Sequence, residues 1–209
     1  MHTPRDERSN WTRSLVVSGG LLIAAFLASR ASSAFIATRF PDRPLPPDLL
    51  FDTLPYVQWM QYVTDIALLT ELALLIWYVA RGHVRELPKM IALFSIMELL
   101  RAFIINLTPL AGPLGNGAFH GIVRVTQNGE FPSGHAASAL LFCLFVDASE
   151  APRLRAVMNV LVVVVCGAML LSHGHYSIDI VGGLLLSYFV YHEYADGRLF
   201  DWLKPLVTP

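Results

Sequence analysis

The sequence predicts an all-α, polytopic membrane protein built as a bundle of six transmembrane helices. The 209 residues are 55% hydrophobic and only 15% charged, whereas soluble domains carry about 25% charged residues. The mean hydropathy is +0.53, and apolar segments near the length of a bilayer-spanning helix recur along the chain. We therefore expect one membrane-embedded domain over residues 1–209, with tails at 1–14 and 195–209. The net charge of −1 gives no support for a nucleic-acid partner.

The six expected spans are separated by segments that cannot continue a helix. They are Leu15–Thr38, Val57–Ala80, Leu87–Leu107, His135–Val146, Leu154–Leu171 and Tyr176–Tyr194. The first is followed by the proline-rich stretch RFPDRPLPPDLLFDTLP, and the third by a long connection rich in Gly and Pro. The fourth is short because Asp147 ends its apolar run, so it must borrow flanking residues to span a bilayer.

The first span has an alternative interpretation. A basic N-terminus, an apolar stretch and the sequence ASRASSA are together typical of a cleaved signal peptide. Cleavage would leave five spans and put the new N-terminus outside. A retained first span agrees better with the distribution of positive charge.

Lys and Arg predict the orientation, because cytoplasmic loops carry an excess of them. On one side of the predicted bundle lie Arg5, Arg8, Arg13, Arg81, Arg85, Lys89, Arg153, Arg155, Arg198 and Lys204. On the other lie Arg39, Arg43 and Arg124. Both termini are therefore expected in the cytoplasm. Two polar stretches, FPSGHAASAL (131–140) and SHGHYSIDIVGG (172–183), then open together on the outer face.

His175 and Asp179 start the last span four residues apart, so their side chains share one helix face. An aspartate at one imidazole nitrogen fixes the tautomer, leaves the other nitrogen free to attack, and stabilises the cation formed afterwards. Ionisable groups at a membrane boundary are costly and usually functional. The alternative is that Asp179 only caps the helix while His175 bonds to a carbonyl.

In PSGH, Pro132 ends any preceding helix and Ser133 is a favourable N-cap for the fourth span. The free N–H groups and dipole of that helix start favour an anion. We expect Ser133 and Gly134 to hold phosphate oxygens, with His135 as general acid to a departing alkoxide. An ordinary cap with an interfacial histidine is the alternative.

These two motifs carry a resemblance to a known family. FPSGH followed by HYSID resembles the type 2 phosphatidic acid phosphatase superfamily, and SGH and HYSID are most similar to its sphingomyelin synthase branch. The stretches LPPDLLFDTLPYVQW, LRAFIINLTPLAGP and YFVYHEYADGRL also resemble that branch, so the likeness covers roughly residues 39–199.

The resemblance implies a six-span enzyme that moves a phospho-headgroup between lipids through a phosphohistidine, without a metal or other cofactor. It implies His175 as nucleophile, Asp179 as its orienting partner, and His135 as acid and then base. The donor would be a glycerophospholipid and the acceptor a lipid alcohol such as ceramide or diacylglycerol. We expect the site on the outer face of a membrane, for which the bacterial inner membrane is the expected location, and homo-oligomerisation stays open.

The sequence also departs from the family. Met169 stands where the phosphatase branch has an arginine, while the proline of FPSGH is shared with the phosphatases and a cysteine-containing segment of the synthase branch is lacking. The phosphate charge must then be met by other groups, and we expect Arg101, Arg124 and His173 to contribute. The alternative for Arg101 is a structural ion pair with Glu98, one turn back.

Two other functions stay open. A lipid phosphate phosphatase would use water as the acceptor in the same site. A non-enzymatic metal or proton transporter would use the polar cluster, for example with His173, His175, His135 and Asp179 around a metal. The intramembrane acids Asp65, Glu71 and Glu98 would line a headgroup pocket or form hydrogen bonds between helices. Cys143 and Cys166 match no zinc spacing and are expected to be small core residues.

Overall fold

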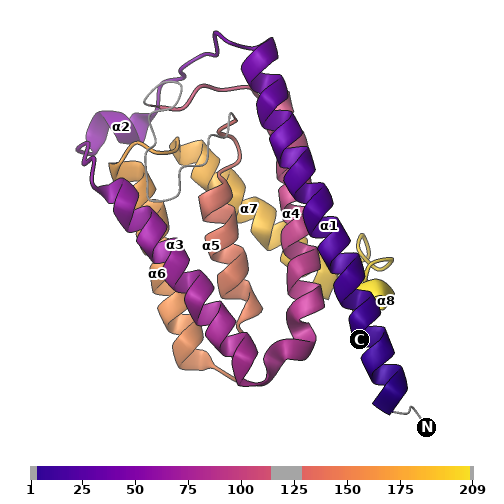
Figure 1. Cartoon of the computed structure of the whole chain (residues 1–209). Coiled ribbons are helices and arrows are strands. Elements are labelled where there is room, and N and C mark those ends of the chain that lie inside the picture. Colours follow the sequence, from indigo (N-terminus) through magenta and orange to yellow (C-terminus); the bar gives the residue numbers. More distant parts are fainter. Residues whose placement is uncertain (1–3, 114–128, 208–209) are drawn as a thin grey trace.

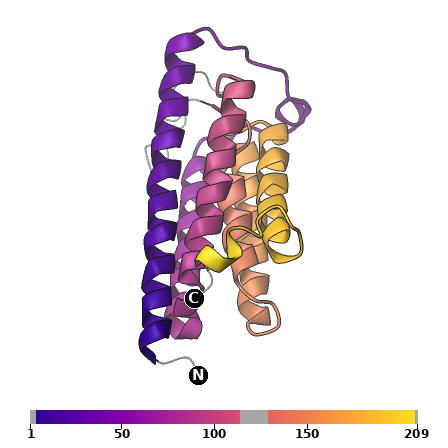
Figure 2. The same cartoon turned by 90° about the vertical axis from the view of Figure 1, so that its right-hand side faces the viewer.

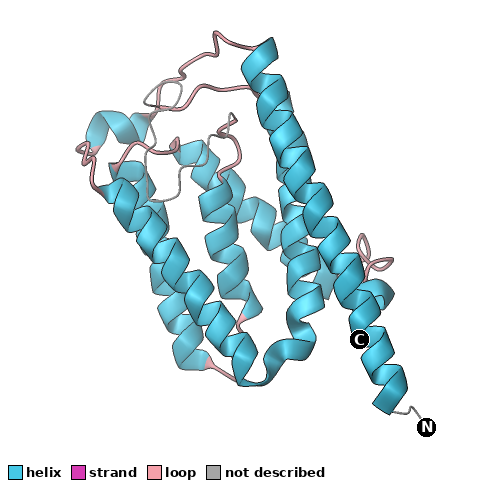
Figure 3. Ribbon diagram, viewed as in Figure 1, coloured by secondary structure: helices cyan, strands magenta, loops and turns pink. Residues whose placement is uncertain are grey.

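The computed structural model describes residues 4–113 and 129–207, and these form helices and loops with no strand among them (Figure 3). The helices are α1 (Pro4–Arg39), α2 (Leu49–Thr53), α3 (Met60–Tyr78), α4 (Leu87–Leu107), α5 (Gly134–Phe145), α6 (Pro152–Leu171), α7 (Ser177–Ala195) and α8 (Lys204–Val207). Two short turns, η1 (Val79–His83) and η2 (Val84–Glu86), join α3 to α4. Each of the six expected spans corresponds to one helix, and most ends differ by three residues or fewer, but α1 begins at Pro4, well before the expected Leu15.

The long helices form a bundle around α5, which contacts α3, α4, α6 and α7 (Figures 1 and 2). Its buried face is made of small and apolar side chains: Ala136, Ala137, Ala139, Leu141 and Cys143. Cys143 is thus a core residue, as predicted. Small side chains let neighbouring helices approach closely, which is how helices pack where lipid removes the hydrophobic drive to associate.

The length and composition of three helical segments suit a membrane crossing: Asn10–Arg39, Met60–Leu107 and Pro152–Leu171. The second contains both α3 and α4, which reverse direction at Gly82, whose φ of 142° is available to glycine and not to other residues (Figure 1). Large apolar side chains on the outer faces are exposed, such as Ile23, Val160, Val163 and Leu185. Together these features indicate a membrane protein.

The count of six spans stays a prediction. At 12 residues, α5 is a short apolar helix that ends early because the run of apolar residues stops at Asp147. Its last carbonyls are not left unpaired, because Arg155 Nη1 donates to Val146 O at 2.8 Å. The sequence of α7 is less apolar than the three segments above, since Asp179 and His192 occupy its two ends.

α1 packs along α4 through a stripe of small residues that includes Ser18, Ala25 and Ser29. Ser18 Oγ donates to Pro88 O at 2.7 Å, and Asn106 Nδ2 donates to Ser32 Oγ at 2.9 Å, so both ends of the contact carry a polar link. The segment resembling a cleavage site lies within this helix. Both chain ends lie toward the end of the bundle opposite α2 (Figures 1 and 2).

Candidate active site

The two polar stretches converge at one end of the bundle. His135 lies in the first turn of α5, and His175 lies in the turn between α6 and α7. Their ring centroids are 5.9 Å apart and the ring planes meet at 61°. The convergence that the sequence predicted therefore exists, because α5 and α7 start side by side at the same end.

Ser133 holds the start of α5 against its neighbours. Its N–H donates to Asp179 O at 2.9 Å, and its Oγ accepts from Ala136 N at 3.3 Å as the predicted N-cap. The hydroxyl donates to Met169 Sδ at 3.6 Å, and the residue has no exposed surface. The N–H and the hydroxyl of Ser133 are thus both engaged within the protein, and Gly134, the next residue of the motif, lies beside Arg101.

Two glycines of α7 allow this close approach. A Cβ on Gly183 would stand 2.5 Å from Ser133 O, and one on Gly182 would stand 2.5 Å from the Phe131 ring. Real side chains do not tolerate either distance. The pair in IDIVGG therefore lets the residues before α5 lie directly on α7, which sets the position of His135 relative to His175.

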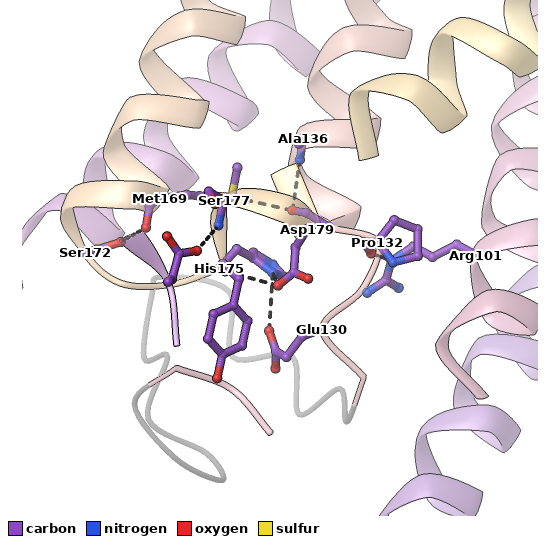
Figure 4. Close-up of polar contacts among 12 residues, drawn as sticks. Arg101, Glu130, Pro132, Ala136, Met169, Ser172, His175, Ser177 and Asp179 are labelled. Atoms are coloured by element: carbon purple, nitrogen blue, oxygen red, sulfur yellow. Dashed lines mark hydrogen bonds and ion pairs between the residues drawn. The ribbon is translucent and has the colours of Figure 1, made fainter. Parts of the chain in front are cut away.

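His175 lies between two carboxylates, as Figure 4 shows. Its Nδ1 is 3.5 Å from Asp179 Oδ2 and 3.2 Å from Glu130 Oε2. Asp179 Oδ2 also accepts from Tyr176 N at 3.1 Å, in a capping box at the start of α7. Asp179 thus caps α7 and lies beside the imidazole at the same time, because the capping hydrogen bond holds its carboxylate in that place. Orienting His175 and capping the helix are therefore not alternatives.

Glu130 is a site residue that sequence reasoning missed. It stands at the end of the long loop, five positions before His135, and reaches across to His175 on another element. Burial raises the pKa of its carboxyl, and the neighbouring His175 opposes this rise. The only sequence signal was an acid beside FPSGH, and no local spacing links it to the HYSID motif.

His135 also has an acidic neighbour. Its Nε2 is 3.6 Å from Asp65 Oδ1, and the Asp65 side chain on α3 is almost fully buried. Each histidine of the site therefore faces at least one carboxylate. Asp65 was one of three acids expected either to line a pocket or to link helices.

The other two intramembrane acids, Glu98 and Glu71, do not lie beside a histidine of the site in any contact described for them. Glu98 Oε2 lies 3.8 Å from Arg101 Nη1 on the same helix. Glu71 is fully buried in α3, and neither carboxyl oxygen has a hydrogen-bond partner among the described residues. Glu98 is thus part of the surroundings of the site, whereas Glu71 lies outside it.

Arg101 brings a buried guanidinium from α4 to the start of α5. Its Nε donates to Pro132 O at 2.9 Å, and a Cβ on Gly134 would stand 3.1 Å from the same nitrogen (Figure 4). Arg101 keeps its ion pair with Glu98 at 3.8 Å while its guanidinium lies beside Gly134. A structural ion pair and a role in meeting the phosphate charge are therefore compatible. Arg124 lies outside the described residues.

His173 turns away from the two catalytic candidates. With a φ of 48°, it stacks on Phe51 of α2 at a centroid distance of 4.1 Å, beside Tyr56 at 5.2 Å. The same short helix is fixed to α7 by Asp48, whose carboxylate accepts from Ser177 N at 2.6 Å and from Leu50 N at 2.9 Å. Asp48 and these aromatic rings thus attach α2 to the end of the bundle that holds the site.

The comparison with known families agrees with this geometry. Residues 131–196 match the family model described as PAP2 superfamily C-terminal. This part of the chain is therefore similar to the PAP2 superfamily. The matched segment contains both histidines and Asp179, and the likeness suggests phosphatase- or phosphotransferase-type activity on lipids. No curated protein matches the chain.

Proposed function

We propose that this protein, which is similar to the PAP2 superfamily over residues 131–196, is a membrane phosphotransferase similar to sphingomyelin synthases. It would move a phospho-headgroup from a glycerophospholipid to a lipid alcohol such as ceramide or diacylglycerol. The observation that carries the proposal is the pair of histidine rings, 5.9 Å apart and each beside a carboxylate. A phosphorus fits between them if one nitrogen attacks at about 3–3.5 Å and the other lies within hydrogen-bond reach of the leaving oxygen.

In the first step, His175 Nε2 attacks the phosphorus and the bond from phosphorus to the glyceride oxygen breaks. Nδ1 keeps its proton toward Asp179 and Glu130, so the attacking lone pair is on Nε2 and the resulting cation is stabilised. Protonated His135 gives its proton to the departing oxygen, and diacylglycerol leaves.

In the second step, His135 is neutral and takes the proton of the acceptor hydroxyl. The acceptor oxygen attacks the phosphorus, the phosphorus–nitrogen bond breaks, and His175 is restored. The guanidinium of Arg101 and the N–H of Gly134 at the start of α5 are placed to meet the phosphoryl charge. Neither step requires a metal.

The acceptor distinguishes this proposal from a phosphatase, in which water takes the phosphoryl group. Burial favours the lipid alcohol: Asp179 has no exposed surface, and His175 is 8% exposed. A site that holds little water gives a phosphohistidine time to meet a second lipid. Met169 stands where the phosphatase branch has an arginine, and this difference also favours a lipid alcohol over water as the acceptor.

A reconstitution experiment tests the proposal. The purified chain is placed in vesicles with headgroup-labelled phosphatidylcholine, phosphatidylethanolamine, phosphatidylglycerol or phosphatidic acid, together with fluorescent ceramide or diacylglycerol. We expect a new labelled phospholipid from at least one pair. Release of only the free phospho-headgroup, which is inorganic phosphate in the case of phosphatidic acid, would identify the phosphatase, and no turnover with any donor would contradict both enzyme functions.

The nucleophile is tested by trapping. A p-nitrophenyl phosphodiester donor should leave an acid-labile phosphoenzyme on the wild-type chain and none on His175→Ala. His192→Ala is the control, because His192 lies in the last turn of α7, at the end away from His175. Transfer that persists in His175→Ala would exclude this residue as the nucleophile.

A further inference from the structure

Two carboxylates lie around one atom of the proposed nucleophile, Nδ1 of His175. The donor atoms of Glu130, His175 and Asp179 all lie within 4.8 Å of one another (Figure 4). This group differs from the combination of histidines that the sequence suggested for a metal, because His173 stacks on Phe51 instead. One imidazole nitrogen and two carboxylates form a mixed donor set that suits Zn²⁺ and similar transition metals better than Mg²⁺.

A second observation also points to a ligand at this position. His175 Nδ1 and Asp179 Oδ1 are buried and have no hydrogen-bond partner among the described residues. The Glu130 and Asp179 carboxylates lie near Nδ1, but neither contact has the geometry of a hydrogen bond. Leaving buried polar atoms unpaired costs about 1–3 kcal/mol each. A cation among the three groups would satisfy His175 Nδ1 and would bring its charge beside the Asp179 carboxylate.

The distances suit a tetrahedral ion. Bonds of about 2.0–2.2 Å to nitrogen and oxygen place neighbouring ligand atoms about 3.3–3.6 Å apart. The measured separations from His175 Nδ1 are 3.2 Å to Glu130 Oε2 and 3.5 Å to Asp179 Oδ2. The site can therefore close on an ion with small side-chain shifts and leave one coordination position for water.

We propose that Glu130, His175 and Asp179 form an inhibitory site for a divalent transition metal such as Zn²⁺. A metal on Nδ1 takes the lone pair of that nitrogen, so the ring proton must lie on Nε2. Nε2 then has no lone pair to attack phosphorus. Metal binding and phosphotransfer therefore exclude one another, because they require opposite tautomers of the same ring.

Binding is measured without reference to activity. The full chain in detergent is stripped with chelator, dialysed, and titrated with Zn²⁺ by calorimetry and with Co²⁺ by visible absorption. We expect one ion per chain, a tetrahedral Co²⁺ spectrum, and no displacement by excess Mg²⁺. Glu130→Gln and His175→Ala should each weaken binding by at least about tenfold, as expected when a metal ligand or its close support is lost.

His135→Ala is the matched control for binding. It removes the other histidine of the same pocket, which is not a proposed ligand, and should bind Zn²⁺ as the wild-type chain does. Equal binding by wild type, Glu130→Gln and His175→Ala, or loss of binding in His135→Ala as well, would mean an adventitious ion only and would overturn the site.

The inhibitory effect rests on the proposed function and is tested separately. Zn²⁺ at saturating concentration should abolish phosphoenzyme formation from the p-nitrophenyl donor, and chelator should restore it. Full activity with Zn²⁺ bound would overturn the inhibitory role and leave the phosphotransferase standing. A chain with no activity toward any lipid would refute the proposed function, while the calorimetry would still decide whether the three residues bind metal.

Discussion

At the scale of single residues, the site consists of imidazoles matched to carboxylates. His135 and Asp65 come from α5 and α3, whereas His175 lies just before α7 and Asp179 lies in its first turn. The sequence predicted this local pair from a helical spacing of four, but His175 precedes the helix, and it is the capping box at Tyr176 that holds Asp179 beside it. The pairs involving Asp65 and Glu130 were not predictable, since nothing in the sequence near either acid specifies which histidine it will meet.

Asp65 is expected to position His135 and support its protonated form. Asp65→Asn should lower kcat for natural lipid donors by about 10- to 100-fold, a part of the about 10²–10⁴-fold that a general acid–base supplies. KM should change little. A p-nitrophenyl donor needs no leaving-group proton, so the defect should nearly vanish with it.

Asp65→Glu, which keeps the charge, should recover part of the activity. An equal loss of activity with both kinds of donor would show that Asp65 only maintains the fold.

At the scale of elements, the position of the start of α5 depends on its close packing against α7. Gly183→Ala would force Ser133 O and the new Cβ apart from 2.5 Å, and a backbone atom cannot rotate away as a side chain can. We expect a loss of activity of at least about tenfold, because small displacements of catalytic groups have large effects on rate. Gly167→Ala on α6 is the control, because a Cβ there has nothing within 4 Å, and it should leave the activity unchanged.

The attachment of α2 to α7 is a second element-scale feature. Burial opposes ionisation of Asp48, but the hydrogen bonds from Ser177 and Leu50 outweigh it and lower the pKa of Asp48 below its ordinary 3.8. Because the folded-state pKa is the lower one, the carboxylate stabilises the fold fully above pH 3.8 and loses this contribution as the pH falls through the lowered value.

Asp48→Asn keeps an acceptor oxygen for the cap but removes its charge, and it should therefore reduce the stability of the folded protein in detergent by about 1 kcal/mol at neutral pH, the usual difference between a hydrogen bond to a charged acceptor and one to a neutral acceptor. The difference from wild type should shrink in acid, where Asp48 is itself neutral. Asp52→Asn, on the exposed side of the same short helix, should have little effect at any pH. A difference that grew toward low pH would contradict this account.

At the scale of the whole molecule, the distribution of Lys and Arg predicts that α2 and the site face outward. The structure separates the α2 end from the α5–α6 turn (Figure 1). In a chain whose Cys143 and Cys166 have been replaced, Asp52→Cys should react with a membrane-impermeant maleimide from outside intact cells. Ser149→Cys in the α5–α6 turn should react only after permeabilisation. Labelling of both from one side would refute the predicted topology.

The sequence by itself determined the helical class and a helix at each expected span, and it predicted the convergence of His135 and His175. The helices depend on hydropathy and on proline and glycine in the loops, which are local, and the convergence follows from the number of helices between the two histidines, which puts both at the same end of the bundle. Only the tertiary structure brought Glu130 and Asp65 to the two rings, set Arg101 beside Gly134, and turned His173 onto α2. Such contacts join residues far apart in the chain, and they depend on how closely helices pack, which Gly182 and Gly183 permit but no local pattern specifies.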